Sequence, residues 1–401
     1  MIEFDDAQKR LSDAAPALTT TESVDLAALS GRVLAKPLHA QLDMPAADNS
    51  AMDGYAVRIA DLRDAESLPV SQIVYAGTPA APLAPGSVAR VFTGSVMPRG
   101  ADTVIMQEDV DAEGDSIRIK GTHTQGQHIR KRGEDARKDS VLVTAGTRLD
   151  AAHIALLATQ GLARADVYTR LRVGILTTGD ELVNPGEPRA EHQIYNSNAT
   201  MLQVLVQTMG AQATCVMHAA DDLDSHTAAF KTLADQCDLV ISVGGVSVGD
   251  KDMVKPALQA LGASLELWRV RMKPGKPVAL AHLGDVPVVG LPGNPVSAYA
   301  VFTLLVTPLI RRMQGRSDIF PYVSHVTLRT EQPRQDSREE FLRARLNLVT
   351  GSNAELELFG RQGSGVTASL AWASGLARIP ASHPVYDGEK VAYYEFSRWL
   401  N

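Results

Sequence analysis

Residues 171–315 alternate short apolar segments with amphipathic ones, and this rhythm constrains the fold more than any other feature of the chain. The strand-like segments lie at 171–179, 213–217, 238–245, 277–283 and 287–293. Several of the intervening segments place apolar residues three or four positions apart, as helices do. Because strands that alternate with helices pair in parallel and are covered on both faces, we predict a three-layer α/β domain with a mainly parallel sheet.

The rest of the chain follows a different pattern. Residues 44–140 and 319–401 carry short alternating runs, which are typical of small β-rich domains or barrels. Residues 1–14 place their apolar side chains on one side of an amphipathic helix. A chain of 401 residues is too long for one ordinary core, so the sequence predicts a multidomain protein of the α/β plus β class.

Three glycine-bearing loops follow strands of the predicted sheet. The first, SVGGVSVGDKD at 242–252, places glycines between an apolar strand and a helix. The other two lie at 177–182 and 290–298, at the same end of the sheet. Ligands of open α/β sheets bind at this edge, where glycine lets backbone N–H groups approach a phosphate. Tight turns alone would explain each loop, but the convergence of all three favours an anion-binding pocket.

Charged side chains near these loops suit a phosphorylated ligand and a divalent cation. Lys273 and Lys276, in the turn MKPGKP, can pair with phosphate oxygens, and a solvated lysine is the common alternative. Glu181 and Asp252 are the favoured Mg²⁺ ligands among the nearby acids, because Mg²⁺ binds one or two carboxylates together with phosphates and water. Helix capping is the alternative role for these acids.

Composition excludes several classes of function. The net charge of −7 argues against nucleic-acid binding, which needs a basic face. Cys215 and Cys237 are the only cysteines, so no disulfide framework is expected and a reducing compartment fits best. The N-terminus lacks the features of a signal peptide. The apolar stretch at 296–310 is short for a membrane span, and we expect it to be a buried helix.

Seven motifs then occur in a specific order. They are DNSAMDGYAV, GADTVIMQED, RKRGED, TTGDEL, SVGGVSVGDKD, MKPGKP and GLPGNPVSA. As a set they closely resemble the molybdopterin molybdenumtransferase family, to which gephyrin is related. The resemblance extends from about residue 28 to residue 375 and covers most of the chain.

This resemblance implies a fold of four domains and a homodimer. The active site would lie where the α/β domain of one subunit faces the β-rich domain of the other. The expected parts are an N-terminal helix packed on the α/β domain (1–19), an elongated linking domain (20–43 and 141–170), a β-rich domain (44–140), a molybdopterin-binding α/β domain (171–318) and a C-terminal β-barrel (319–401).

The resemblance also implies an activity. The enzyme would take molybdate, place molybdenum on the dithiolene of adenylylated molybdopterin and release AMP, with Mg²⁺ as the cation. We expect a cytoplasmic protein that binds neither nucleic acid nor membrane. The adenylyl transferase that makes the substrate and the molybdoenzymes that receive the cofactor are candidate partners.

Motif by motif, the resemblance assigns site residues. The catalytic candidates are Asp53, Thr93, Asp135, Glu181, Asp221, Asp252 and Lys273. The substrate-binding candidates are Gly244, Gly245, Ser247, Gly249, Arg269, Lys276, Pro292, Gly293, Asn294, Pro295, Arg343 and Ser364. Lys273 and the glycine loops would hold a phosphate or pyrophosphate. Mg²⁺ would bind Asp252 with Asp221 or Glu181, and molybdate would bind Arg343, Ser364 and the prolines.

Two residues depart from the family pattern. Arg269 stands where lysine is frequent, and Asn196 replaces an acid in the segment IYNSN. These changes leave open a paralogue that prefers tungstate. Two further alternatives stay open. The protein could be a non-catalytic scaffold that binds molybdopterin, or it could be the adenylyl transferase that makes the substrate. The motifs outside the α/β domain argue against a generic nucleotide-binding enzyme.

Overall fold

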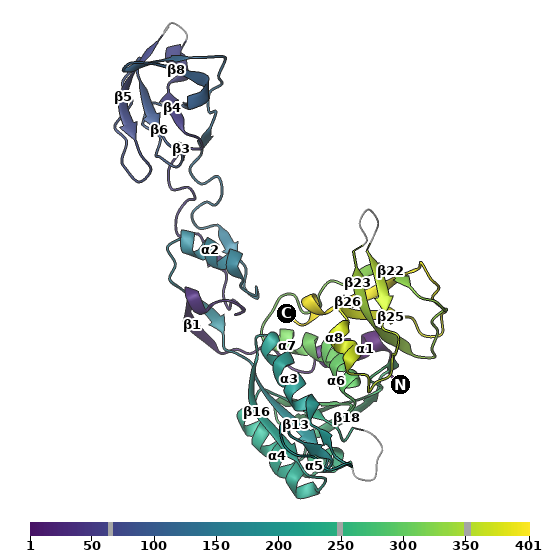
Figure 1. Ribbon diagram of the computed structural model, residues 1–401. Coiled ribbons are helices and arrows are strands. Elements are labelled where there is room, and N and C mark those ends of the chain that lie inside the picture. Colours follow the sequence, from purple (N-terminus) through teal and green to yellow (C-terminus); the bar gives the residue numbers. More distant parts are fainter. Residues whose placement is uncertain (63–66, 247–251, 349–353) are drawn as a thin grey trace. The chain divides into compact units, whose positions relative to one another are not determined.

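A computed structural model describes residues 1–62, 67–246, 252–348 and 354–401 of the chain (Figure 1). The chain divides into two compact units. Unit 1 contains Met1–Lys36, Ala145–Asp150 and Arg164–Asn401, and unit 2 contains Pro37–Thr144 and Ala151–Ala163. The boundaries of the five predicted parts stay predictions.

A six-stranded sheet forms the centre of unit 1, in the order β16-β13-β17-β21-β20-β18. The strands are β13 (Arg172–Thr178), β16 (Gln212–Ala219), β17 (Leu239–Val243), β18 (Ser264–Arg269), β20 (Pro277–Leu283) and β21 (Val286–Leu291). The first four strands in this order pair in parallel, and β20 and β18 are antiparallel to their neighbours. The mainly parallel sheet is confirmed, whereas the sequence pattern did not predict strand β18.

Helices cover both faces of this sheet and form two apolar cores. The helices are α3 (Ser197–Thr208), α4 (Leu223–Gln236), α5 (Val254–Ala260), α6 (Pro295–Val301) and α7 (Thr307–Met313). Helices α3, α6 and α7 contribute to one buried cluster, which includes Leu202 and Ile175, and α4 and α5 contribute to the other, which includes Phe230 and Leu176. The predicted three-layer α/β domain is therefore confirmed.

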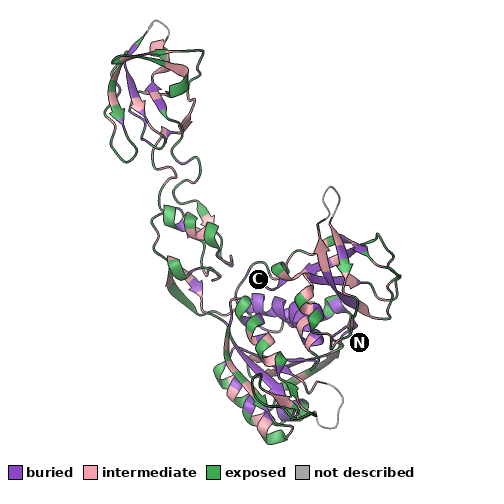
Figure 2. Cartoon of the chain, in the orientation of Figure 1, coloured by how far each residue is buried: buried purple, intermediate pink, exposed green. Residues whose placement is uncertain are grey.

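The apolar segment 295–313 is one continuous buried helix. A π-helical segment, η4 (Phe302–Val306), joins α6 to α7, and every residue of η4 is buried. Within the described residues this helix has the length and composition of a membrane span, but it lies mostly inside the protein (Figure 2). The expectation of a buried core helix is confirmed.

The amphipathic N-terminal segment forms helix α1 (Phe4–Ser12). Its Phe4, Ala7 and Leu11 are fully buried in the core that also contains α7. The Gln8 Nε2 atom donates a 2.7 Å hydrogen bond to the carbonyl of Leu304, which fixes the helix against η4.

The C-terminal part of unit 1 is a closed β-barrel. Its strands are β22 (Ser324–Arg329), β23 (Glu339–Asn347), β24 (Glu355–Leu358), β25 (Gly375–Ile379) and β26 (Lys390–Glu395). The barrel closes because β23 pairs with both β24 and β25. The short strand β19 (Met272–Lys273) extends the barrel sheet by pairing with β23. The predicted C-terminal barrel is confirmed.

Unit 1 also contains short strand pairs and helices outside these layers. They are β1 (Thr21–Asp25) with β12 (Arg164–Tyr168), β14 (Leu182–Val183) with β15 (Ile194–Tyr195), η1 (Leu26–Ala28), α8 (Ala368–Trp372) and α9 (Phe396–Trp399).

Unit 2 contains a second six-stranded sheet, in the order β7-β4-β6-β5-β9-β8. Its strands are β4 (Gly54–Val57), β5 (Leu68–Val74), β6 (Val88–Val91), β7 (Thr103–Met106), β8 (Val110–Glu113) and β9 (Ser116–Ile119). The smaller elements are β2 (Leu38–His39), β3 (Asn49–Ser50), β10 (Ile129–Arg130), β11 (Val141–Val143), η2 (Ile59–Leu62), η3 (Gln107–Asp109) and α2 (Ala151–Thr159). The predicted β-rich domain is confirmed.

Candidate functional site

A cavity of about 370 Å³ opens at the carboxyl edge of the unit 1 sheet. Its lining comes from the ends of β13 and β17, from the loop after β21, and from the segment after β14. The lining residues are Thr177, Thr178, Glu181, Leu182, Ile194, Tyr195, Asn196, Ser197, Asn198, Val243, Gly244, Gly293, Asn294 and Pro295. The three glycine-bearing loops therefore meet, as their positions after parallel strands predicted.

Gly244 shows why glycine stands at this edge. Its φ of +96° belongs to the region that L side chains rarely adopt. A Cβ atom here would lie 2.7 Å from the Thr178 Oγ1 atom and 3.2 Å from the Thr178 carbonyl oxygen. Any larger residue would therefore strain the backbone and push the first and second loops apart.

The loop that follows Gly244 brings a carboxylate to the same edge. A Cβ atom on Gly245 would lie 3.1 Å from the Asp252 Oδ1 atom and 2.5 Å from Val254. The same Oδ1 atom accepts a 3.3 Å hydrogen bond from the Val254 amide, at the start of α5. The candidates Ser247 and Gly249 lie outside the described residues.

The predicted metal ligands occupy neighbouring loops. Glu181 lines the cavity, and its carboxylate fills the space where a side chain on Gly179 would lie. Asp221 is half-buried and donates its amide to the Asp180 Oδ1 atom at 3.1 Å. No three acidic, histidine or cysteine side chains among the described residues form a complete metal site. Glu181 and Asp252 stay the predicted Mg²⁺ ligands, because Mg²⁺ can use one or two carboxylates and take its other oxygens from phosphates and water.

Asn196 and Asn198 form a wall of the cavity and are hydrogen-bonded to two of the glycine-bearing loops. Asn196 is buried and caps α3, because its Oδ1 atom accepts from the Ala199 amide while its Nδ2 atom donates to Thr177 at 2.8 Å. The Asn198 Nδ2 atom donates a 2.7 Å hydrogen bond to the Gly293 carbonyl. The buried Oδ1 atom of Asn198 has no hydrogen-bond partner within the described part of the chain. It is therefore an acceptor that a ligand or water can satisfy.

The predicted basic residues lie outside this cavity. The Lys273 Nζ atom forms ion pairs with Asp336 and Glu340, each at 2.9 Å. Because the Lys273 ammonium donates hydrogen bonds to the Glu340 and Asp336 carboxylates, the pKa of Lys273 is raised. Arg269 and Lys276 do not line the cavity, and Lys276 is exposed. Lys273 thus joins the α/β domain to the barrel, and its predicted contact with phosphate stays a prediction.

Arg343 holds a loop of the barrel from within. Its guanidinium is fully buried, donating to the Ser369 Oγ atom at 3.0 Å and to the Gly363 carbonyl at 3.1 Å. Burial lowers the pKa of Arg343 to about 10. Ser364, in the same loop, accepts a 3.3 Å hydrogen bond on its carbonyl from the Val296 amide, next to the cavity. Pro292 is buried and lies outside the cavity lining.

The three candidates of unit 2 lie on exposed loops. Asp53 Oδ1 accepts hydrogen bonds from the Thr93 amide at 2.7 Å and from the Thr93 hydroxyl at 2.8 Å. These two bonds hold the pKa of Asp53 below its usual value. Asp135 is exposed, and its amide donates to the Met44 carbonyl. The structure therefore joins Asp53 to Thr93, as one carboxylate–hydroxyl pair.

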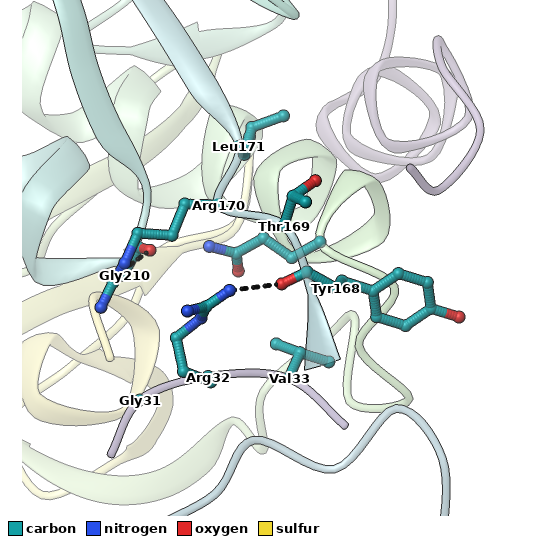
Figure 3. A pocket seen from close by; sticks show the side chains of 9 residues that line it. Gly31, Arg32, Val33, Tyr168, Thr169, Arg170, Leu171 and Gly210 are labelled. Carbon is teal, nitrogen blue, oxygen red and sulfur yellow. Dashed lines mark hydrogen bonds between the residues drawn. The ribbon is translucent and has the colours of Figure 1, made fainter. Parts of the chain in front are cut away.

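A second cavity in unit 1 is too small for a substrate. It measures about 10 Å³ and lies beside Arg32 and Arg170 (Figure 3). Arg32 donates to the Tyr168 carbonyl at 2.8 Å, and Arg170 donates to the Gly210 carbonyl at 3.0 Å. A single water needs roughly 10–15 Å³, so this space holds one water at most. We therefore assign the candidate site to the larger cavity.

Comparisons with known proteins agree with this architecture. Residues 2–161 match the MoeA N-terminal region (domain I and II), 174–312 a probable molybdopterin binding domain, and 325–396 the MoeA C-terminal region (domain IV). The molybdopterin molybdenumtransferase of a Nostoc species is 39% identical over 90% of this chain and 85% of its own. That of Haemophilus influenzae is 38% identical over 79% of this chain and 78% of its own.

This chain belongs to the molybdopterin molybdenumtransferase family. A crystal structure of the molybdopterin biosynthesis moeA protein from Pyrococcus horikoshii OT3 shares the fold, with a TM-score of 0.84 and 30% identity over 98% of this chain and 99% of that one. The expectation of an enzyme of molybdenum cofactor biosynthesis is confirmed at the level of the family. The individual site residues stay predictions.

For this member of the molybdopterin molybdenumtransferase family, sequence reasoning missed the wall formed by 194–198. The sequence marks Asn196 only as a departure from a more usual acid, although it caps α3 and lines the cavity. A signal was present, because an Asn followed by a helix-forming segment is a frequent N-cap. The parallel pairing of β14 with β15, which brings this wall to the glycine loops, has no such signal.

Proposed function

We propose that this enzyme inserts molybdate into adenylylated molybdopterin and releases AMP in a Mg²⁺-dependent step, giving the molybdenum cofactor. The supporting observation is the cavity at the carboxyl edge of the sheet, where glycine loops and the Glu181 carboxylate meet. Its volume of about 370 Å³ falls within the range of small-molecule sites. The relatives named molybdopterin molybdenumtransferase support molybdopterin and molybdate as substrates.

Backbone groups of the cavity would bind the phosphate-bearing end of the substrate. Gly244 and Gly293 leave room for phosphate oxygens close to the main chain. Asn198 would donate or accept a hydrogen bond through the amide that closes the wall. Because these groups belong to a rigid sheet edge, they would orient the phosphoanhydride before it is cleaved.

Carboxylates at the same edge would hold Mg²⁺. Glu181 and Asp252, with Asp221 from the neighbouring loop, would supply oxygen ligands. When bound, Mg²⁺ neutralises charge that develops on the phosphate oxygens. The cleavage transfers the adenylyl phosphorus to water, so the products are AMP and the phosphate of the pterin.

Molybdate would bind near the junction of the cavity with the barrel. The candidates are Pro295, Arg343 and Ser364, and the Val296 amide already contacts the Ser364 carbonyl. Because the buried Arg343 guanidinium donates to the Ser369 hydroxyl and the Gly363 carbonyl, Arg343 would act by positioning this loop. We also propose that the protein is a cytoplasmic homodimer and that it contacts the adenylyl transferase and molybdoenzymes.

AMP release from adenylylated molybdopterin tests this function. Wild type should release AMP in the presence of Mg²⁺ and molybdate, and Asp252→Ala should lose most of this activity. Asp285→Ala, which removes an exposed acid in a distant turn, is the matched control. Absence of AMP release with molybdate and with tungstate would leave a binding scaffold. Consumption of ATP with free molybdopterin would instead indicate the adenylyl transferase.

A further inference from the structure

One face of the unit 2 sheet carries an ordered row of aromatic rings and a guanidinium. The rings of Tyr75 and Phe92 stack with centroids 5.0 Å apart and an interplanar angle of 6°. The Arg90 guanidinium lies 5.1 Å from the Phe92 ring centroid and 4.9 Å from that of Tyr55. The row therefore runs from Tyr75 through Phe92 and Arg90 to Tyr55.

Strand register explains this row. Tyr55 pairs with Arg90 across β4 and β6, so their side chains share one face of the sheet. Val74 pairs with Val91 across β5 and β6. Tyr75 and Phe92 are the residues that directly follow these two strands. The Arg90 Nη2 atom donates to the Gln107 Oε1 atom at 2.6 Å, which holds the guanidinium in place. The row is thus built before any ligand arrives.

Tyr75 is not needed for the core of unit 2. Val74 and Val91, which precede Tyr75 and Phe92 and pair with each other, point to the opposite face and are buried. Phe92 covers one face of the Tyr75 ring, yet 56% of Tyr75 is exposed. An exposed ring, stacked and oriented by its neighbour, offers a flat surface to a second planar group.

The row lies beside the carboxylate–hydroxyl pair described above. Phe92 is followed directly by Thr93, which donates two hydrogen bonds to Asp53. Asp53 is two residues before Tyr55 at the other end of the row. A ligand that stacks on Tyr75 would therefore have a guanidinium and an ionised carboxylate within the same strand-end region.

We propose that the exposed face of Tyr75 stacks on the adenine ring of the adenylylated substrate. This inference rests on the proposed function, which supplies an adenylyl group. Bases stack on aromatic side chains without needing a hydrogen-bond code, because every base has a π-face. A pterin ring shares this chemistry, so the test compares AMP with a free pterin.

Titration of the intact protein with AMP tests this assignment. Tyr75→Ala should weaken AMP binding about tenfold or more, whereas Tyr75→Phe should bind like wild type because it keeps the ring. Tyr386→Ala is the matched control, since Tyr386 is 52% exposed and lies in unit 1. The H2 and H8 protons of AMP should shift upfield with wild type, and Tyr75→Ala should abolish that shift. Circular dichroism would verify that each variant is folded.

Two results would overturn the assignment to adenine. The first is equal AMP affinity in wild type and Tyr75→Ala, or no binding of AMP to wild type. The second is Tyr75-dependent binding of a free pterin with unchanged binding of AMP. AMP release measured in parallel separates this inference from the proposed function. If wild type releases AMP but AMP binding does not depend on Tyr75, the stacking alone is refuted. If AMP binding depends on Tyr75 but wild type does not turn over, the proposed function alone is refuted.

Discussion

The glycine-loop cavity of unit 1 and the Asp53–Thr93 pair of unit 2 differ in whether their polar groups already have hydrogen-bond partners. The cavity is lined mainly by threonine, serine, asparagine and glycine residues, and Asn198 keeps a buried oxygen without a partner among the described residues. In unit 2, the Asp53 carboxylate is exposed and already accepts two hydrogen bonds from Thr93. One region is concave and has capacity left for a ligand, whereas the other is an exposed pair with its charge fixed.

The unit 1 cavity therefore depends on its shape, whereas the unit 2 pair depends on the ionisation of Asp53. Gly244 has a positive φ and a close neighbour in Thr178, so the cavity depends on the absence of a side chain. Asp53 depends on donors that keep its pKa low, so its behaviour depends on pH and on Thr93. Substitutions that add atoms should therefore damage the first region most, and substitutions that remove a donor should alter the second.

Gly244→Ala should have the largest effect. The added Cβ atom meets Thr178 at 2.7 Å, and displacement of about 1 Å at a reacting group can cost about a hundredfold in rate. Gly284→Ala is the matched control, because its φ is also positive, at +60°, but nothing lies within 4 Å of the added atom. AMP release should fall about a hundredfold in the first variant and stay near wild type in the second. Equal loss in both would show that backbone strain, not cavity shape, is responsible.

Glu181→Gln should weaken the response to Mg²⁺. It removes the charge of the carboxylate that lines the cavity and keeps the size of the side chain. The Mg²⁺ concentration for half-maximal AMP release should rise about tenfold, with less change for molybdate. Glu187→Gln, an exposed acid six residues along the chain, should leave both values unchanged. An unchanged Mg²⁺ response in Glu181→Gln would exclude this residue as a metal ligand.

Lys273→Met should reduce the free energy of unfolding by about 1 kcal/mol, because it leaves Asp336 and Glu340 without their shared cation. The effect is small because the Lys273 side chain is 40% exposed and solvent screens its charge. The folded-state pKa of Lys273 is raised. Its contribution is therefore complete below the ordinary value of 10.5 and is lost as the pH rises through the folded value.

Urea denaturation of wild type, Lys273→Met and Lys255→Met measures this contribution. Lys255 is exposed on α5 and serves as the control. The difference between wild type and Lys273→Met should be present at pH 7 and should shrink at strongly alkaline pH. A stability equal to wild type, with weaker substrate binding, would instead favour the predicted phosphate contact of Lys273.

Thr93→Val should have the smallest effect, seen in the pH dependence. Loss of the hydroxyl donor removes one of the two bonds that lower the Asp53 pKa, so this pKa should rise toward its usual value. The acid limb of the activity profile should then move to higher pH, while activity at neutral pH changes little. Thr122→Val, an exposed threonine of the same unit, should leave the profile unchanged. An unmoved acid limb in Thr93→Val would show that Asp53 ionisation does not control the rate.

The sequence predicted the sheet-edge cavity well because its signals are local. Apolar segments and glycines identify the ends of β13, β17 and β21, and parallel pairing brings those ends together. The wall at Asn196 and Asn198 depends on a two-residue strand, β15, whose pairing with β14 carries no periodic signal. Elements with strong periodicity were therefore predictable, and the short connection between them was not.

Lys273 and Arg343 illustrate a second limit. The turn around Lys273 is typical of a phosphate-binding segment, but its partners Asp336 and Glu340 follow more than sixty residues later, and the pairing of β19 with β23 brings them together. Arg343 lies inside a barrel strand, where its guanidinium donates to the Ser369 hydroxyl and the Gly363 carbonyl. Sequence indicates the charge of such residues, whereas only the tertiary structure gives their partners.

The most direct test of the proposed function is the ratio of molybdenum transferred to AMP released in a single turnover. Wild type would be mixed with adenylylated molybdopterin, Mg²⁺ and molybdate, and metal bound to the pterin product would be measured beside AMP. The account predicts about one molybdenum atom for each AMP, with both products lost in Gly244→Ala and retained in Gly284→Ala. AMP release without metal transfer, or equal losses in the two glycine variants, would contradict it.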